Sequence, residues 1–181
     1  VEHDITIDLY EQLVAHSPEF DTVDQLERWR ASETQSWKQV DRVVVMSNKD
    51  RRMIGDHSLT VVARNGVDLE LFQPSCGEEE PGRILFIGSF AHLPNLLALD
   101  FFLGEVWPKL QPLSPVLHVI GGSRHEFHYE RQKDRLRFSL DAEGVEFEGF
   151  VADVRPAYHR AAVVIAPLLA SAGTNIKILE A

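Results

Sequence analysis

The feature that most constrains the fold is a regular alternation, from residue 83 onward, between short apolar runs and segments with helical periodicity. Most of the apolar runs are rich in β-branched residues and contain few polar ones, which is typical of strands covered on both faces. The expected strands are "RILFIGSF" (83–90), "VLHVIGG" (116–122), "GVEFEGFV" (144–151) and "AVVIAPLL" (162–169). The expected helices cover 93–110, 125–141, 153–161 and the end of the chain. Strands that alternate with helices predict an α/β fold with a doubly wound, Rossmann-like parallel sheet.

The residues before 68 have the same α/β character but contain too few strands for a core of their own. We expect a helix within 19–41, strands at 41–47 and 59–64 with a short helix between them, and a strand end at the opening "VEHDITIDLY". Residues 68–82 have no periodicity, and they contain two prolines and an acidic triplet. We therefore interpret 1–67 as the C-terminal portion of one Rossmann-like domain, 68–82 as a linker and 83–181 as most of a second domain.

Composition excludes several classes of function. The 181 residues carry a net charge of −10, which opposes nucleic-acid binding, because that binding depends on a basic surface. The single cysteine, Cys76, excludes an internal disulfide framework, and a cytoplasmic location is the natural expectation. No apolar run approaches the roughly 18–20 residues that a membrane-spanning helix needs.

The candidate binding residues lie where the predicted strands end, since ligands of open parallel sheets bind at the carboxyl ends of the strands. Most of these ends are small-residue loops, whose backbone N–H groups can approach a ligand closely. The candidates are Gly88, Ser89, Gly121, Gly122, Phe150, Val151, Ala172, Gly173 and Thr174.

The closing segment "SAGTNIKILEA" (171–181) predicts a helix that begins after a small-residue loop. A helix N-terminus presents unpaired N–H groups and partial positive charge, which favour a phosphate. Lys177 adds a full positive charge there, and Glu180 lies one turn later on the same side and can accept hydrogen bonds from sugar hydroxyls. A diphosphate with an attached ribose would match this pair. Two ordinary explanations stay open at this point, a solvated surface pair and glycines that merely form tight turns.

The order of the motifs adds to this interpretation. "NGVDLELFQP", "ILFIGSF" followed by "PN", "LHVIGG", "GVEFEGFVADV", "VVIAPL" and "GTNIKILEA" follow one another along 41–181. In this order they resemble the nucleotide-sugar-dependent glycosyltransferases of the GT-B fold, family 4, also called group 1 glycosyltransferases. The resemblance implies two Rossmann-like domains facing each other across a cleft. It also implies transfer of a sugar, with retention of configuration and without a metal, from a nucleotide-diphosphate sugar to an acceptor.

The resemblance also assigns roles to individual residues. Glu180 matches the glutamate that hydrogen-bonds the ribose, and Lys177 is a candidate partner of the diphosphate. Gly173 and Thr174 match the loop that meets the donor sugar or phosphate, while Gly88 matches the glycine beneath the diphosphate. The segment of Phe150 and Val151 matches the one beside the base, and His3 matches a histidine that reaches the donor sugar.

Two departures from the family pattern matter. Ala172 stands where the pattern has a glutamate, and Ser89 and His92 stand where a basic residue is expected. These departures keep two alternatives open, a non-catalytic module that binds nucleotides or phosphosugars and a GT-B epimerase of nucleotide sugars. Because most of the acceptor domain is missing, we expect this chain to be inactive by itself.

The expected partners are a nucleotide-sugar donor and a carbohydrate or lipid-linked acceptor, as in polysaccharide biosynthesis, with peripheral membrane association of the full-length protein. We expect no metal and no cofactor besides the donor. His125 and His128 are three residues apart on a predicted helix, but this is not the spacing of a helical zinc motif, and a solvated helix face is the preferred interpretation.

Overall fold

The computed structural model describes residues 4–17, 22–55, 58–74, 77 and 79–181. The chain divides into two units. The first contains Val1–Val67 and Leu169–Leu179, and the second contains Asp68–Leu168 and Glu180–Ala181. None of the helices described in these ranges is both long and apolar enough to cross a membrane.

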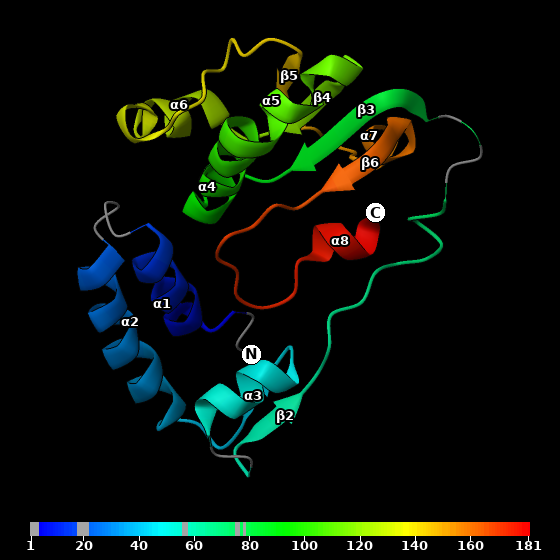
Figure 1. The fold of residues 1–181 in the computed structure, drawn as a ribbon. Coiled ribbons are helices and arrows are strands. Elements are labelled where there is room, and N and C mark those ends of the chain that lie inside the picture. Colours follow the sequence, from blue (N-terminus) through cyan, green and yellow to red (C-terminus); the bar gives the residue numbers. More distant parts are fainter. Residues whose placement is uncertain (1–3, 18–21, 56–57, 75–76, 78) are drawn as a thin grey trace. The chain divides into compact units, whose positions relative to one another are not determined.

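The first unit has two longer helices, a short helix and a pair of short parallel strands (Figure 1). The elements that lie wholly in this unit are α1 (Thr6–His16), α2 (Thr22–Trp37), β1 (Val43–Val45), α3 (Asn48–Ile54) and β2 (Thr60–Val62). The helix expected within 19–41 is thus α2, and the strand–helix–strand order that follows it is confirmed.

In the described part of the N-terminal segment the chain is helical from Thr6 to His16 and does not form a strand, while residues 1–3 of the expected strand end lie outside the described residues. Ile5, Ile7 and Leu9 fit a strand period of two, but Ile5, Leu9 and the buried Leu13 are four residues apart, as on one side of a helix. The carboxylate of Glu33 on α2 accepts hydrogen bonds from the backbone N–H groups of Thr6 (2.7 Å) and Ile7 (3.0 Å). This acceptor satisfies two otherwise unpaired donors in the first turn of α1, and it lies too far along the chain for a local sequence pattern to predict.

The second unit is built on a parallel sheet with strand order β5-β4-β3-β6. The strands are β3 (Glu80–Ile87), β4 (Val116–Ile120), β5 (Val145–Glu148) and β6 (Ala161–Ile165). β3 begins at Glu80, a few residues before the expected start of the strand.

Both faces of this sheet are covered, as the apolar runs predict. On one face, Phe86, Leu117 and Val119 pack with residues of the helical segment 93–110 and with Tyr129. On the other face, Leu85 and Ile120 pack with Tyr158 of α7 (Arg155–Arg160). The alternation of neighbouring strand residues between two separate cores shows the doubly wound arrangement directly, and the predicted α/β class is confirmed.

The segment 93–110 is helical but interrupted. α4 (Leu93–Phe101) continues into a π-helical turn (Phe102–Val106) and then into α5 (Trp107–Leu110). Pro108 has no N–H to donate and its ring crowds the carbonyl four residues earlier, which explains why the helix widens just before it. Pro94 instead lies in the first turn of α4, where no N–H is needed.

The helix expected over 125–141 is much shorter than predicted. α6 covers only His125–Glu130, and a 3₁₀ turn at Lys133–Arg135 follows. The chain leaves the helix so that Phe138 can enter the core, where it lies against Phe147 with ring centroids 6.2 Å apart. The Tyr129 hydroxyl donates to the carbonyl of Phe138 (2.8 Å) and holds this return of the chain. α8 (Ile176–Glu180) closes the chain, as expected.

Candidate functional site

The loops that follow β3, β4 and β5 are joined by backbone hydrogen bonds. The N–H of Gly88 donates to Ile120 (3.0 Å), and the N–H of Phe90 donates to Gly121 (2.8 Å). The N–H of Gly121 in turn donates to Glu148 at the end of β5 (2.8 Å). The carboxyl ends of the strands therefore form one continuous rim, to which the sequence-predicted Gly88, Ser89, Gly121 and Gly122 all belong.

Gly88 is required by close packing rather than by backbone conformation. A Cβ at this position would lie 2.7 Å from both Cγ and Oδ1 of Asn95. The Asn95 side chain donates from Nδ2 to the carbonyl of Ser89 (2.9 Å), and its N–H donates to His92 (3.0 Å). The Asn of the "PN" motif thus holds the β3–α4 loop (residues 88–92) in place, a role that the sequence pattern did not indicate.

Ser89 and Gly122 face each other across the rim. Gly122 has φ +77°, in the left-handed region, and a Cβ on it would lie 3.2 Å from the Ser89 hydroxyl oxygen. That hydroxyl accepts a weak hydrogen bond from the N–H of Ala91 (3.3 Å). The position where the family pattern has a basic residue is therefore a small, neutral group packed against a glycine.

The end of β5 places two apolar side chains differently. The Phe150 side chain is 72% exposed, whereas Val151 packs partly against the core that contains Leu85. An exposed aromatic ring beside the rim can stack on a planar group, because rings prefer offset stacked contacts. Contact of Phe150 and Val151 with the base of a nucleotide stays a prediction.

The loop before α8 belongs to the first unit, where the Gln12 side chain of α1 holds it. Gln12 donates to the carbonyl of Ser171 (3.0 Å) and accepts from the N–H of the same residue (3.1 Å). Gly173 has φ +64°, which explains a glycine there, and Ala172 and Thr174 are half-buried. Gln12 lies 159 positions before Ser171, so no sequence pattern predicted this contact.

Lys177 and Glu180 are both on α8, three residues apart and hence on one side of the helix. Burial lowers the pKa of Lys177. The Tyr158 hydroxyl of α7 donates to Oε2 of Glu180 (3.1 Å), and burial followed by the charge of that carboxylate raises the pKa of Tyr158. Tyr158 is 9% exposed and positions the carboxylate on which the ribose prediction rests. No sequence signal pointed to Tyr158, because α7 and α8 are distant in the chain.

The predicted site residues lie in both units. Glu180 and the candidates from Gly88 to Val151 belong to the second unit, whereas Ala172, Gly173, Thr174 and Lys177 belong to the first. A pyrophosphate pocket that includes the loop at 173–177 therefore stays a prediction. His3 lies outside the described residues. Within the described ranges, no cluster of three or more histidine, cysteine or acidic side chains is arranged to hold a metal ion.

Comparisons with solved structures show the architecture. TarM has a TM-score of 0.53 at 14% identity, over 76% of this chain and 27% of TarM. A TarM variant from S. aureus, crystallised with fondaparinux, alpha-GlcNAc-glycerol and UDP, has a TM-score of 0.54 at 13% identity, with the same two coverages. The pneumococcal O-GlcNAc transferase GtfA, in complex with UDP and GlcNAc, has a TM-score of 0.58 at 10% identity, over 84% of this chain and 30% of GtfA.

These neighbours are GT-B glycosyltransferases, and the parallel sheets of the chain place it in the same fold class. The chain spans less than a third of the length of each neighbour. No curated protein matches the chain in sequence. The family model described as "Glycosyl transferases group 1" matches residues 81–181, which is more than half of the chain. The chain therefore belongs to the group 1 glycosyl transferases.

Proposed function

We propose that this chain is part of an enzyme that transfers a sugar from a nucleotide-diphosphate sugar to a carbohydrate acceptor, with retention of configuration and without a metal ion. The observation that carries the proposal is the family match over residues 81–181, which covers the rim of strand ends and α8. UDP is bound in the TarM and GtfA structures, and GlcNAc in that of GtfA, so UDP-GlcNAc is the first donor to test.

The proposed chemistry is electrostatic. Cleavage of the bond between sugar and diphosphate leaves negative charge on the leaving oxygens and positive charge on the sugar. The ammonium of Lys177 and backbone N–H groups near Gly173 would stabilise the leaving diphosphate. A single oriented donor of this kind contributes about 3–4 kcal/mol in well-studied enzymes. Glu180, oriented by Tyr158, would accept hydrogen bonds from the ribose hydroxyls.

The neutral rim favours a second candidate, a module that binds nucleotide sugars without turning them over. Ser89 offers a hydroxyl packed against Gly122 where the family pattern has a positive charge, and Ala172 offers no carboxylate. Both changes remove groups that act on the transferred sugar or on the diphosphate, while Lys177 and Glu180 remain. Binding without turnover is the behaviour that separates this candidate from the enzyme.

The test is calorimetric titration of the full-length protein with UDP-, GDP- and ADP-sugars, followed by an assay for released nucleoside diphosphate. We expect one nucleotide to bind, and Lys177→Ala to weaken binding about tenfold or more, since a charge-assisted hydrogen bond contributes about 1.5–3 kcal/mol. Lys109→Ala is the matched control, because Lys109 is an exposed lysine of α5 away from the rim. Failure of every nucleotide sugar to bind would refute the proposal, and binding without turnover would select the module.

A further inference from the structure

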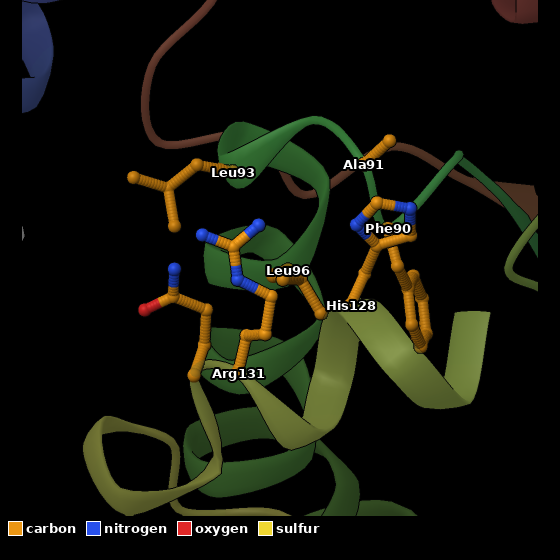
Figure 2. Close-up of a pocket in the computed structure, with 7 residues that line it drawn as sticks. Phe90, Ala91, Leu93, Leu96, His128 and Arg131 are labelled. Carbon is orange, nitrogen blue, oxygen red and sulfur yellow. The ribbon is translucent and has the colours of Figure 1, made fainter. Parts of the chain in front are cut away.

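The second unit contains a small pocket (Figure 2). One wall is formed by the β3–α4 loop and the start of α4, and the other by α6 and the turn that follows it. Its volume is about 110 Å³. Figure 2 shows the side chains of His128 and Arg131 extending from α6 and its C-terminal end toward the loop at Ala91 and toward Leu93. The lining residues are Phe90, Ala91, Leu93, Leu96, His128, Arg131 and Gln132. All of them belong to the second unit.

The pocket has an apolar floor and a polar wall. Phe90 and Leu96, on the floor, are each only 1% exposed. His128, Arg131 and Gln132, on the wall, can all donate hydrogen bonds, and the lining contains no carboxylate. This lining of donors contrasts with the net charge of −10 of the whole chain.

The three polar side chains have no hydrogen-bond or ion-pair partner within the described residues. Arg131 donates its backbone N–H to Phe127, and its guanidinium carbon lies 5.9 Å from the centre of the Phe127 ring, but no described carboxylate pairs with it. The neighbouring Glu130 instead binds Lys133 (2.7 Å). Other arginines of the second unit, such as Arg155 and Arg160, hold carboxylates at 2.6–2.8 Å. Arg131 thus retains its hydrogen-bonding capacity for a group that is not part of the described chain.

The volume limits the size of that group. A water molecule occupies about 30 Å³ in the liquid, so the pocket has room for roughly three to four waters. Sites for drug-sized ligands are larger, at about 300–1,000 Å³. A whole nucleotide would not fit inside this volume, whereas one phosphate or carboxylate group would.

We propose that this pocket binds a single oxyanion, a phosphate monoester or a carboxylate, through Arg131 with His128 and Gln132 as additional donors. The planar guanidinium donates two parallel hydrogen bonds to such a group, and the imidazole and amide donate to its remaining oxygens. The oxyanion can come from free phosphate or from an anionic group on a larger ligand, such as a glycan acceptor. The pocket contains none of the residues assigned above to the nucleotide sugar. The proposal of an oxyanion site can therefore be tested independently of the proposed donor site.

The first experiment is titration of the isotope-labelled protein with inorganic phosphate, followed by NMR of the His128 ring and of the backbone amides from Phe90 to Leu93. A parallel titration with acetate distinguishes a preference for phosphate from one for a carboxylate. We expect saturable shifts confined to these groups. We expect Arg131→Gln to weaken binding about tenfold, the effect of losing a charge-assisted hydrogen bond.

Arg124→Gln is the matched control. Arg124 precedes the same helix, and its guanidinium lies 4.4 Å from the centre of the Phe127 ring, but it does not line the pocket. This substitution removes the same charge and should leave phosphate binding within about twofold of the parent, as for a screened surface charge. His128→Gln, which keeps one donor, should weaken binding less than Arg131→Gln. Because Arg131 is exposed, its substitution should not disturb folding.

The proposal is overturned if neither anion produces saturable shifts at these groups, or if Arg131→Gln and Arg124→Gln weaken binding equally. Nucleotide-sugar titration of the Arg131→Gln protein separates this proposal from the proposed function, since donor binding should be unchanged. Loss of donor binding together with phosphate binding would show that the pocket is not an independent site and would also overturn the proposal.

Discussion

Substitution of Gly88 by alanine tests whether the rim of strand ends is held by the packing of Asn95 against a glycine. The added Cβ would lie 2.7 Å from Cγ and from Oδ1 of Asn95, and 3.1 Å from its Cβ. Real Cβ atoms essentially never lie so close to other heavy atoms, so the Asn95 side chain must move. That movement breaks its hydrogen bond to the Ser89 carbonyl, which is 2.9 Å long.

The expected loss of stability has two parts. The lost hydrogen bond contributes about 1 kcal/mol, and crowding of a packed position adds about 1–3 kcal/mol. The sum of about 2–4 kcal/mol should lower Tm by roughly 5–15 °C for a protein of this size. The freed β3–α4 loop should also weaken nucleotide-sugar binding, because Gly88 and Ser89 are candidate donor contacts.

The assays are urea denaturation and thermal melting, with Gly66→Ala as the control. A Cβ added to Gly66 would have no atom within 4 Å, and this glycine has no positive φ, so its substitution should change the free energy of unfolding little. The double variant Gly88→Ala/Asn95→Ala completes a thermodynamic cycle. Removal of the Asn95 carboxamide relieves the closest overlap, so the double variant should be more stable than the sum of the two single losses by about 1–2 kcal/mol.

Two results would refute this reasoning. Gly88→Ala could prove no more destabilising than Gly66→Ala, which would mean that the Asn95 side chain has room to move at no cost. The two substitutions at 88 and 95 could also prove additive, which would mean that Asn95 is not the group that requires glycine.

Three further predictions concern the same unit and α8. Tyr158→Phe removes the hydrogen bond to Glu180 and should weaken nucleotide-sugar binding about threefold to tenfold, measured calorimetrically, because a typical hydrogen bond contributes about 0.5–1.5 kcal/mol; unchanged affinity would show that the carboxylate needs no positioning. Burial lowers the pKa of Lys177 below its ordinary value of 10.5. Between the lowered pKa of the folded chain and the ordinary pKa of the unfolded chain, the folded chain binds fewer protons. The contribution of Lys177 to the free energy of unfolding should therefore rise with pH over this range. A bound diphosphate should favour the protonated ammonium of Lys177, so binding at alkaline pH should be accompanied by proton uptake. Calorimetric titrations in buffers of different ionisation enthalpy measure this uptake, which Lys177→Met should abolish. Absence of uptake in the parent protein would contradict the placement of Lys177 beside the diphosphate. Asp100→Ala should lower the free energy of unfolding, measured in urea, by about 1–3 kcal/mol, because the buried Asp100 carboxylate accepts hydrogen bonds from the side chain (3.0 Å) and the backbone N–H of Arg137. Glu105 also pairs with Arg137 but is more exposed, so Glu105→Ala should cost less. Equal losses for the two variants would contradict this prediction.

The sequence predicted the repetitive part of the fold well. The apolar runs at β3, β4 and β6 predicted a buried parallel sheet, and the two separate cores on Leu85 and Phe86 confirm strands covered on both faces. It failed where a local pattern fitted two structures. The apolar pattern that begins at Ile5 fits a strand as well as the observed helix α1. The pattern over 125–141 predicts one long helix, but α6 ends at Glu130 and Phe138 is buried in the core.

Many residues of the candidate site could be predicted from the sequence, because the end of a strand is a local feature and ligands of parallel sheets bind at such ends. Gly88, Ser89, Gly121 and Gly122 are indeed joined at one rim, through hydrogen bonds between the ends of β3, β4 and β5. Asn95, Tyr158 and Gln12 were missed. Asn95 acts on the loop six residues before it, whereas Tyr158 and Gln12 contact residues that are 22 and 159 positions away.

The sequence by itself therefore determined the class of fold, the order of its elements and the strand ends at which a ligand is expected, because these depend on periodicities of two and 3.6 residues and on glycines at chain turns. Only the tertiary structure decided which side chains hold those places in position and which polar groups have no partner among the described residues. Such contacts join residues distant in sequence, and their geometry depends on how whole helices pack on the sheet. The pocket lined by His128 and Arg131 is the clearest case. The three donors on this short segment line one pocket only because α4 and the β3–α4 loop lie opposite them.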